Sequence, residues 1–189
     1  MSAEDAVGRR SVLRAGLAVG ASALFAPRAV ARQTAATAAP KEGDLLVRAD
    51  DPEHRPLRPA DIPLNTGQVA AWAMDPADRT VRSGTRLNGI VLLRLDGASL
   101  AAVTRTRAAE GVVAYTAICT HNGCDVDGYI AEQSALSCSC HESQFDARDG
   151  ARVVDGPAPR PLPGLPLKVV EGMLVVAGPF TSRVGFERG

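Results

Sequence analysis

Cysteine and histidine are concentrated in one short stretch of this chain. Of the four cysteines and three histidines in 189 residues, six lie between positions 119 and 141. The stretch reads C-T-H-N-G-C from Cys119 to Cys124 and C-S-C-H-E-S from Cys138 to Ser143. Each half offers a thiol and an imidazole close together, as metal-binding turns do. This pattern predicts a metal centre held by two turns that face each other.

The types of ligand indicate which metal centre the two turns hold. Thiolates suit a ferric iron, whereas neutral imidazoles suit an iron that cycles to the ferrous state. Two cysteines and two histidines therefore fit an asymmetric 2Fe-2S cluster, and two cysteines remain for another use. A structural zinc ion is an alternative, but it takes four ligands and leaves two thiols without a role. Disulfides among all four cysteines would leave two histidines idle at matched positions.

The two cysteine and histidine boxes resemble those of the Rieske iron–sulfur proteins, which read C-T-H-x-G-C and C-x-C-H-x-S. The resemblance covers roughly residues 111–177 and implies one 2Fe-2S cluster per chain. It implies that Cys119 and Cys138 bind one iron and that His121 and His141 bind the other. Such a protein transfers single electrons and is not a catalyst on its own.

Further features of the resemblance surround the predicted cluster. It implies a disulfide between Cys124 and Cys140, which closes a 17-residue loop (140 − 124 + 1) worth about 3 kcal/mol. It implies that Ser143 contributes to cofactor binding through a hydrogen bond from its hydroxyl group to a bridging sulfide. The segment Gly156-Pro157-Ala158-Pro159 is similar to the proline-rich loop that covers the cluster in this family. Because proline has little freedom to lose, two prolines make a stiff cover.

Three residues of the chain depart from the family pattern. Ser139 and Glu142 stand in the second box where many members have proline and glycine, and Phe145 stands where the quinol-oxidising members usually have tyrosine. None of these changes removes a ligand. We expect them to affect the reduction potential of the cluster and the choice of redox partner.

The first 31 residues are typical of a twin-arginine export signal. Arg9 and Arg10 precede a 12-residue apolar run, and Ala29-Val30-Ala31 has the small-x-small pattern of a cleavage site. A 12-residue helix spans about 18 Å, which is short of a bilayer core of roughly 30 Å. Residues 32–42 are rich in alanine and threonine and predict a flexible linker. The resemblance implies that residues 43–189 form a Rieske domain, with the cluster-binding loops at about 117–160.

Short apolar segments bounded by turn residues predict a mainly antiparallel β fold. Ile90–Leu95 and Gly111–Ile118 read as buried strands, joined by a short helix or an exposed loop. Asp149-Gly150 and Glu171-Gly172 each separate two further strand-like segments, and Asp149-Gly150 suits a type I′ hairpin turn. The fold class is therefore all-β, with an antiparallel sandwich or small barrel as the base. The family resemblance implies a cluster-binding subdomain inserted into it.

Charge and composition limit the possible partners. The formal net charge is zero and aromatic residues make up 4%, so the basic surface and stacking residues of a nucleic-acid binder are missing. The export signal and the pair Cys124 and Cys140 argue against the oxygenase-linked Rieske proteins, which work in the cytoplasm. The short apolar run, the cleavage site, Phe145 and the polar stretch 96–110 favour the small subunit of a periplasmic oxidoreductase, similar to that of arsenite oxidase. The alternatives are the quinol-oxidising Rieske subunit of a membrane cytochrome bc-type complex, anchored if the signal is not cleaved, and a free periplasmic electron carrier. The expected partners are a larger oxidoreductase subunit, cytochrome c or cytochrome b, and the twin-arginine translocase.

Overall fold

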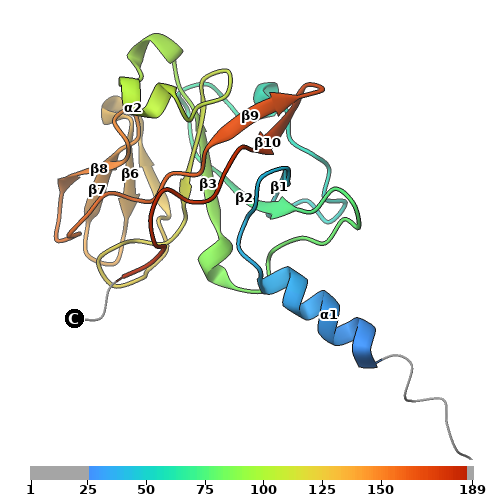
Figure 1. The fold of residues 1–189 in the computed structure, drawn as a ribbon. Coiled ribbons are helices and arrows are strands. Elements are labelled where there is room, and N and C mark those ends of the chain that lie inside the picture. The colour runs from blue at the N-terminus through green and yellow to red at the C-terminus, as the bar shows by residue number, and fades with distance from the viewer. Residues whose placement is uncertain (1–25, 187–189) are drawn as a thin grey trace, which may run out of the picture.

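The computed structural model describes residues 26–186, which form two antiparallel β-sheets with few helices (Figure 1). The larger sheet contains β1 (Leu45–Arg48), β2 (Val69–Met74), β3 (Ile90–Arg94), β4 (Val112–Thr116), β9 (Leu167–Val170) and β10 (Met173–Val176). The smaller sheet contains β5 (Gly128–Ile130), β6 (Ala135–Cys138), β7 (Ser143–Asp146) and β8 (Arg152–Asp155). The helices are α1 (Ala26–Thr37) and α2 (Ala102–Arg105), with 3₁₀ turns at Pro59–Asp61, Arg86–Asn88, Gly97–Ser99 and Ala131–Gln133. The predicted all-β class is confirmed.

The larger sheet, with α1, is the base of the molecule. Its strand order is β4-β3-β2-β1-β10-β9, so strands from both ends of the chain lie side by side in it. The edge strand β4 also bonds to the segment that leads into β9, because the Leu165 N–H donates to the Ala114 oxygen (2.9 Å). Since the two edges of the sheet meet in this way, the base curls into a small barrel.

The smaller sheet, which we call the cluster sheet, is inserted between β4 and β9. Its strands follow one another in the order β5-β6-β7-β8, and in Figure 1 they stand apart from the β9–β10 hairpin. Both cysteine and histidine boxes lie in this insertion. The predicted inserted subdomain is therefore present.

Strands β3 and β4 belong to two hydrophobic cores at once. Ile90 and Leu92 face the core of the base, whereas Val91 and Leu93 face a second core that contains Cys119 and Cys138. Successive side chains of a strand point to opposite faces, so an uninterrupted apolar run is what a strand between two cores requires. The second core thereby joins the cluster sheet to the base.

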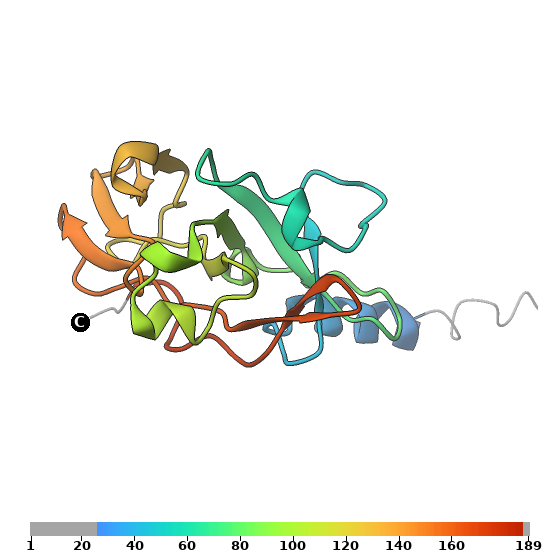
Figure 2. The same ribbon diagram turned by 90° about the horizontal axis from the view of Figure 1, so that it is seen from above.

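The structure differs from the sequence expectation at the start of the described region. Helix α1 extends to Thr37, so the flexible linker predicted for residues 32–42 is wrong up to that residue. The side chains of Arg82 and Asn88 donate hydrogen bonds to carbonyl oxygens at the end of the helix (3.2 and 2.7 Å). They satisfy acceptors that a helix leaves unpaired at its C-terminus. Figure 2 shows α1 projecting from the base on the side away from the cluster sheet.

The export signal remains a prediction. Residues 1–25, which include the arginine pair and nearly all of the apolar run, lie outside the described residues. Within residues 26–186, no helix has the length and apolar character needed to cross a membrane.

The two predicted hairpins form, and one of their turns differs from expectation. The β9–β10 turn has two residues, Glu171 and Gly172, both with positive φ (52° and 77°), as a type I′ turn requires. Between β7 and β8 the positive φ values fall on Gly150 and Ala151 (61° and 52°), so the type I′ turn predicted at Asp149-Gly150 is wrong. The loop there is longer because Asp146 pairs with Arg152.

Candidate metal centre

Two tight loops form the metal centre, one after β4 and one between β6 and β7. In the first box, the Cys119 N–H donates to the Cys124 oxygen (2.8 Å), which folds the loop back on itself. In the second box, Cys138 and Ser143 are the last paired residues of the two strands, so the loop between them has four residues. Cys138 thus ends strand β6, Cys119 follows β4 by three residues, and each histidine lies in a turn.

The predicted cysteine ligands are buried and unbridged. Cys119 and Cys138 are each 1% exposed, and neither forms a disulfide. Burial raises the pKa of the Cys138 thiol, and the neighbouring Cys119 raises it further. A hydrogen bond from the Cys140 backbone N–H to the Cys138 sulfur lowers the pKa of that thiol. Two buried sulfurs side by side favour a metal ion that stabilises both as thiolates.

The two predicted histidine ligands lie next to each other. The His121 and His141 ring centroids are 4.6 Å apart and their planes are almost perpendicular (88°). His121 is half-buried and His141 is exposed. Nδ1 of His121 is buried without a hydrogen-bond partner among the described residues. A buried nitrogen without a hydrogen-bond partner fits a metal ligand, because leaving a buried polar atom unpaired otherwise destabilises the fold.

Ser143 gives a second sign of a missing partner. Its side chain is fully buried, and Oγ has no hydrogen-bond partner among the described residues. This orphaned hydroxyl lies in the residue that ends the second box, where the sequence predicts a hydrogen bond to a sulfide. Phe145, two residues further along β7, is also fully buried and brings no hydroxyl group of its own. The residues present therefore fit a 2Fe-2S cluster with one serine donor.

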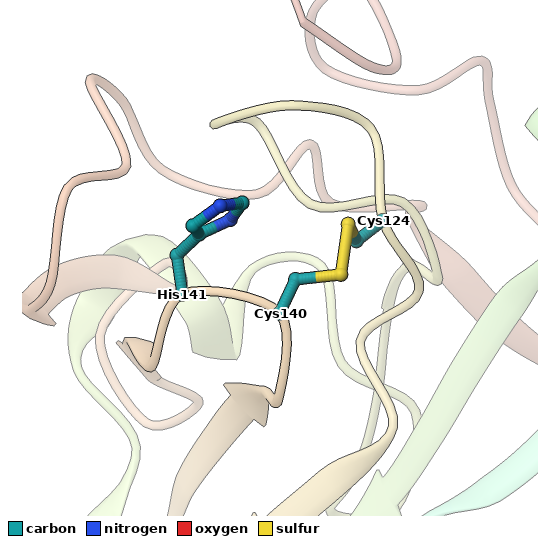
Figure 3. Close-up of side chains that lie close together, drawn as sticks. All are labelled: Cys124, Cys140 and His141. Carbon is teal, nitrogen blue, oxygen red and sulfur yellow. A yellow bond between two sulfur atoms is a disulfide. The ribbon is translucent and has the colours of Figure 1, made fainter.

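The predicted disulfide is confirmed. Cys124 and Cys140 are bonded in the structure, and this bond joins the first box to the second. Figure 3 shows the His141 ring beside the disulfide. The ligand atoms of these three residues lie within 4.8 Å of one another. The two sulfurs are bonded to each other and are not thiolates, so this group is not a second metal site.

The proline-rich loop packs against the second box, and its role as a cover of the cluster stays a prediction. Gly156 has a φ of +79°, and a Cβ atom there would lie 2.5 Å from the Ser143 Cα. Only glycine allows so close an approach of two backbones. Ala158 is buried in the second core, while Pro157 and Pro159 are exposed. The loop is thus held at two alternate residues and presents its prolines to solvent.

Three contacts of the centre were not predicted from the sequence. Arg86 donates to the Gly123 oxygen (2.9 Å) and pairs with Asp125 (2.5 Å), which ties the first box to the base. The Thr120 hydroxyl donates to the Arg160 oxygen (2.7 Å). The sequence offers a signal for Thr120, because this residue lies inside the first box.

The third contact joins Asp127 to the second box. Its carboxylate accepts hydrogen bonds from the Ser139 N–H (3.0 Å) and the Ser139 hydroxyl (2.5 Å). These bonds lower the pKa of Asp127, the side-chain bond having the larger effect. Arg86 and Asp127 carry no local sequence signal, since they reach the boxes only in the fold.

Comparison with known proteins identifies the family. The model of the Rieske [2Fe-2S] domain matches residues 71–166, which contain both boxes and the proline-rich loop. The Rieske iron–sulfur subunit of the cytochrome bc1 complex of Streptomyces lividans is 36% identical over 154 residues, which is 78% of this chain and 89% of that protein. The corresponding subunit of Streptomyces coelicolor is also 36% identical, but this chain covers 43% of its length.

Other similar proteins come from different systems. A putative Rieske subunit of a respiratory nitrate reductase from Haloferax mediterranei is 47% identical over 76 residues, 40% of this chain and 34% of that protein. Among solved structures, the soluble domain of Rieske protein II of Sulfolobus acidocaldarius has a TM-score of 0.39 and 25% identity, covering 53% of this chain and 67% of that chain. The chain belongs to the Rieske family and is an electron-transfer protein with a Rieske-type 2Fe-2S cluster.

Proposed function

We propose that Cys119 and Cys138 ligate one iron of the cluster and that His121 and His141 ligate the other. When bound, the cluster would supply one-electron chemistry, and His121 and His141 would hold the iron that accepts the electron. The protein keeps water from the sulfur side, because both cysteines are buried in the second core. Since His141 is the exposed ligand, its edge is where the electron enters and leaves.

The chain works as the Rieske subunit of a respiratory complex of the cytochrome bc type, taking electrons from a quinol and passing them to a cytochrome. The observation that carries this proposal is the match to a bc1 Rieske subunit over 89% of that protein. It reverses the order in which the sequence alone ranks the candidates. The chain is exported by the twin-arginine route and faces the outer side of the cytoplasmic membrane.

A second candidate is the electron-transfer subunit of another periplasmic oxidoreductase. Phe145 favours it, because this buried residue lacks the hydroxyl that the quinol-oxidising members usually have. The similarity to a nitrate reductase Rieske subunit also supports it. Both candidates share the same cluster and the same exposed histidine.

Purification of the native complex distinguishes the two candidates. A C-terminally tagged chain is isolated from solubilised membranes, and its partners are identified by mass spectrometry. Cytochrome b and quinol–cytochrome c reductase activity are expected. A molybdopterin-containing partner would support the second candidate, whereas the chain alone in the soluble fraction would contradict both. N-terminal sequencing of the same sample tests cleavage after Ala31, and replacing Arg9 and Arg10 by lysine should block export.

A further inference from the structure

The second box contains a polar contact that proline at position 139 would not allow. Ser139 stands between Cys138, a predicted ligand, and Cys140, which is in the disulfide. Both its backbone N–H and its hydroxyl donate to the Asp127 carboxylate. Proline has neither an N–H nor a hydroxyl group. The contact therefore depends on one of the residues in which this chain departs from the family pattern.

The backbone holds Asp127 firmly in this place. Its N–H donates to the Ser137 oxygen (3.1 Å), and Gly128 follows it in β5, paired with Ser137. The two strands lie so close that a Cβ atom at position 128 would be 2.2 Å from the Ser137 hydroxyl. The carboxylate is thus aimed at the second box by the register of β5 and β6.

Asp127 keeps its negative charge at this position. Its lowered pKa means that it is ionised at neutral pH. Within residues 26–186, no lysine or arginine forms an ion pair with it, in contrast to Asp125, which pairs with Arg86. The Asp127 carboxylate is bonded to the residue next to the predicted ligand Cys138, and its charge acts on that sulfur. One-electron reduction adds a negative charge to the cluster, so such a carboxylate opposes reduction.

We infer that Asp127 is a positioning residue that holds the Cys138–Cys140 segment through Ser139 and, by its charge, lowers the reduction potential of the cluster. The conformation of this segment also affects the cluster, because it directs the Cys140 N–H at the sulfur of the predicted ligand Cys138. Removing the charge should favour reduction about threefold, which corresponds to a rise of about 30 mV for one electron.

The test is voltammetry of the cluster-loaded protein at low and high salt. Asp127→Asn removes the charge but keeps an oxygen that accepts from the Ser139 N–H, and Asp127→Glu keeps the charge. We expect a rise in potential for Asp127→Asn that becomes smaller at high salt, and a potential close to that of the unchanged protein for Asp127→Glu. Glu171→Gln is the matched control, because Glu171 is an exposed acid in the β9–β10 turn of the base (Figure 1).

Two results would overturn the inference. One is an unchanged potential in Asp127→Asn at low salt, and the other is an equal rise in Glu171→Gln. If Asp127→Asn does not load a cluster, Asp127→Ser removes the same charge and offers a neutral acceptor, so its potential is subject to the same expectation. A shift in Asp127→Glu without one in Asp127→Asn would show that only side-chain length matters and would also contradict the role of the charge.

Discussion

The base and the cluster sheet are held together by different forces. In the base, β3 and β4 are almost entirely buried, and a salt bridge between Arg82 and Asp44 is also buried (4% and 0% exposed). In the cluster sheet, β5 is only half-buried and β8 is mostly exposed. Its inner strands β6 and β7 pack into the second core, and a disulfide joins its two loops. Apolar burial stabilises the base, whereas covalent and metal bonds replace part of that burial in the cluster sheet.

Replacing a predicted iron ligand should give the largest difference between the two regions, because it should affect the cluster sheet and leave the base folded. Cys138→Ala or His121→Ala should abolish the cluster, because in each variant one iron lacks one of its two protein ligands. The base should stay folded, since its core contains neither residue. Iron and sulfide analysis with circular dichroism checks this. Retention of two irons and two sulfides in either variant would show that the ligand assignment is wrong.

The buried salt bridge of the base should give the next largest effect. Asp44→Asn leaves the buried Arg82 without its main partner, and we expect a loss of about 3 kcal/mol in the free energy of unfolding by urea. Asp50→Asn is the control, because the exposed Arg48–Asp50 pair should contribute less than about 1 kcal/mol. The cluster spectrum of the folded protein should not change in either variant. An equal loss of unfolding free energy in Asp44→Asn and Asp50→Asn would show that burial does not strengthen the Arg82–Asp44 salt bridge.

Removal of the disulfide should weaken the cluster sheet without emptying it. The bond spans a sequence separation of 16 residues, for which the chain-entropy estimate is about 3 kcal/mol at most. The double variant Cys124→Ser and Cys140→Ser should assemble the cluster and lose it at a lower temperature, as followed by visible absorbance. Iron loss as complete as in Cys138→Ala would indicate that these cysteines are ligands.

The interface between the two regions should respond to alkaline pH through Tyr115. Burial raises the pKa of Tyr115 to about 12, and its hydroxyl donates to the Ala147 oxygen (2.8 Å). The folded state therefore keeps a proton that the unfolded chain loses near pH 10. Stability is fully present below about pH 10 and falls by roughly 2 to 3 kcal/mol as the pH rises to about 12.

The variant Tyr115→Phe tests that titration. It should be less stable at neutral pH by about 1 kcal/mol, because it lacks the hydrogen bond. Between about pH 10 and pH 12 it should lose less stability than the unchanged protein. Parallel curves of unfolding free energy against pH for the two proteins would rule out Tyr115 as the titrating group.

The smallest effect concerns hydrogen bonds to the cluster. Ser143→Ala removes a buried hydroxyl and should lower the reduction potential, since donors to sulfur stabilise the reduced state. Phe145→Tyr adds a hydroxyl and should raise the potential by about 40 mV if the bond contributes roughly 1 kcal/mol. Voltammetry measures both shifts. No rise in Phe145→Tyr would mean that this ring is not placed against a ligand sulfur.

The sequence predicts the elements whose signals are local. β3, β4, β9 and β10 are apolar runs, and the two boxes and the proline-rich loop are short motifs. β1 and β2 are missed. β2 contains three alanines, which are weak strand formers. Helix α1 is missed because Arg82 and Asn88 cap it from distant parts of the chain.

The same distinction applies to the site. The six cysteine and histidine residues of the boxes and Ser143 lie in or at the ends of two tight loops, which a short motif can specify. Asp127 lies ten residues or more from every residue of the second box and reaches Ser139 only through the pairing of β5 with β6. A long-range contact of this kind leaves no pattern in a single sequence.

Electron paramagnetic resonance of the reduced protein, with histidine labelled by ¹⁵N, tests the central claim most directly. The claim is that two buried cysteines and two adjacent histidines bind one asymmetric cluster. We predict the low average g value of a cluster with nitrogen ligands, and hyperfine coupling to two histidine nitrogens that changes with the label. A 2Fe-2S signal without histidine coupling, or a protein that holds one zinc and no sulfide, would contradict the account.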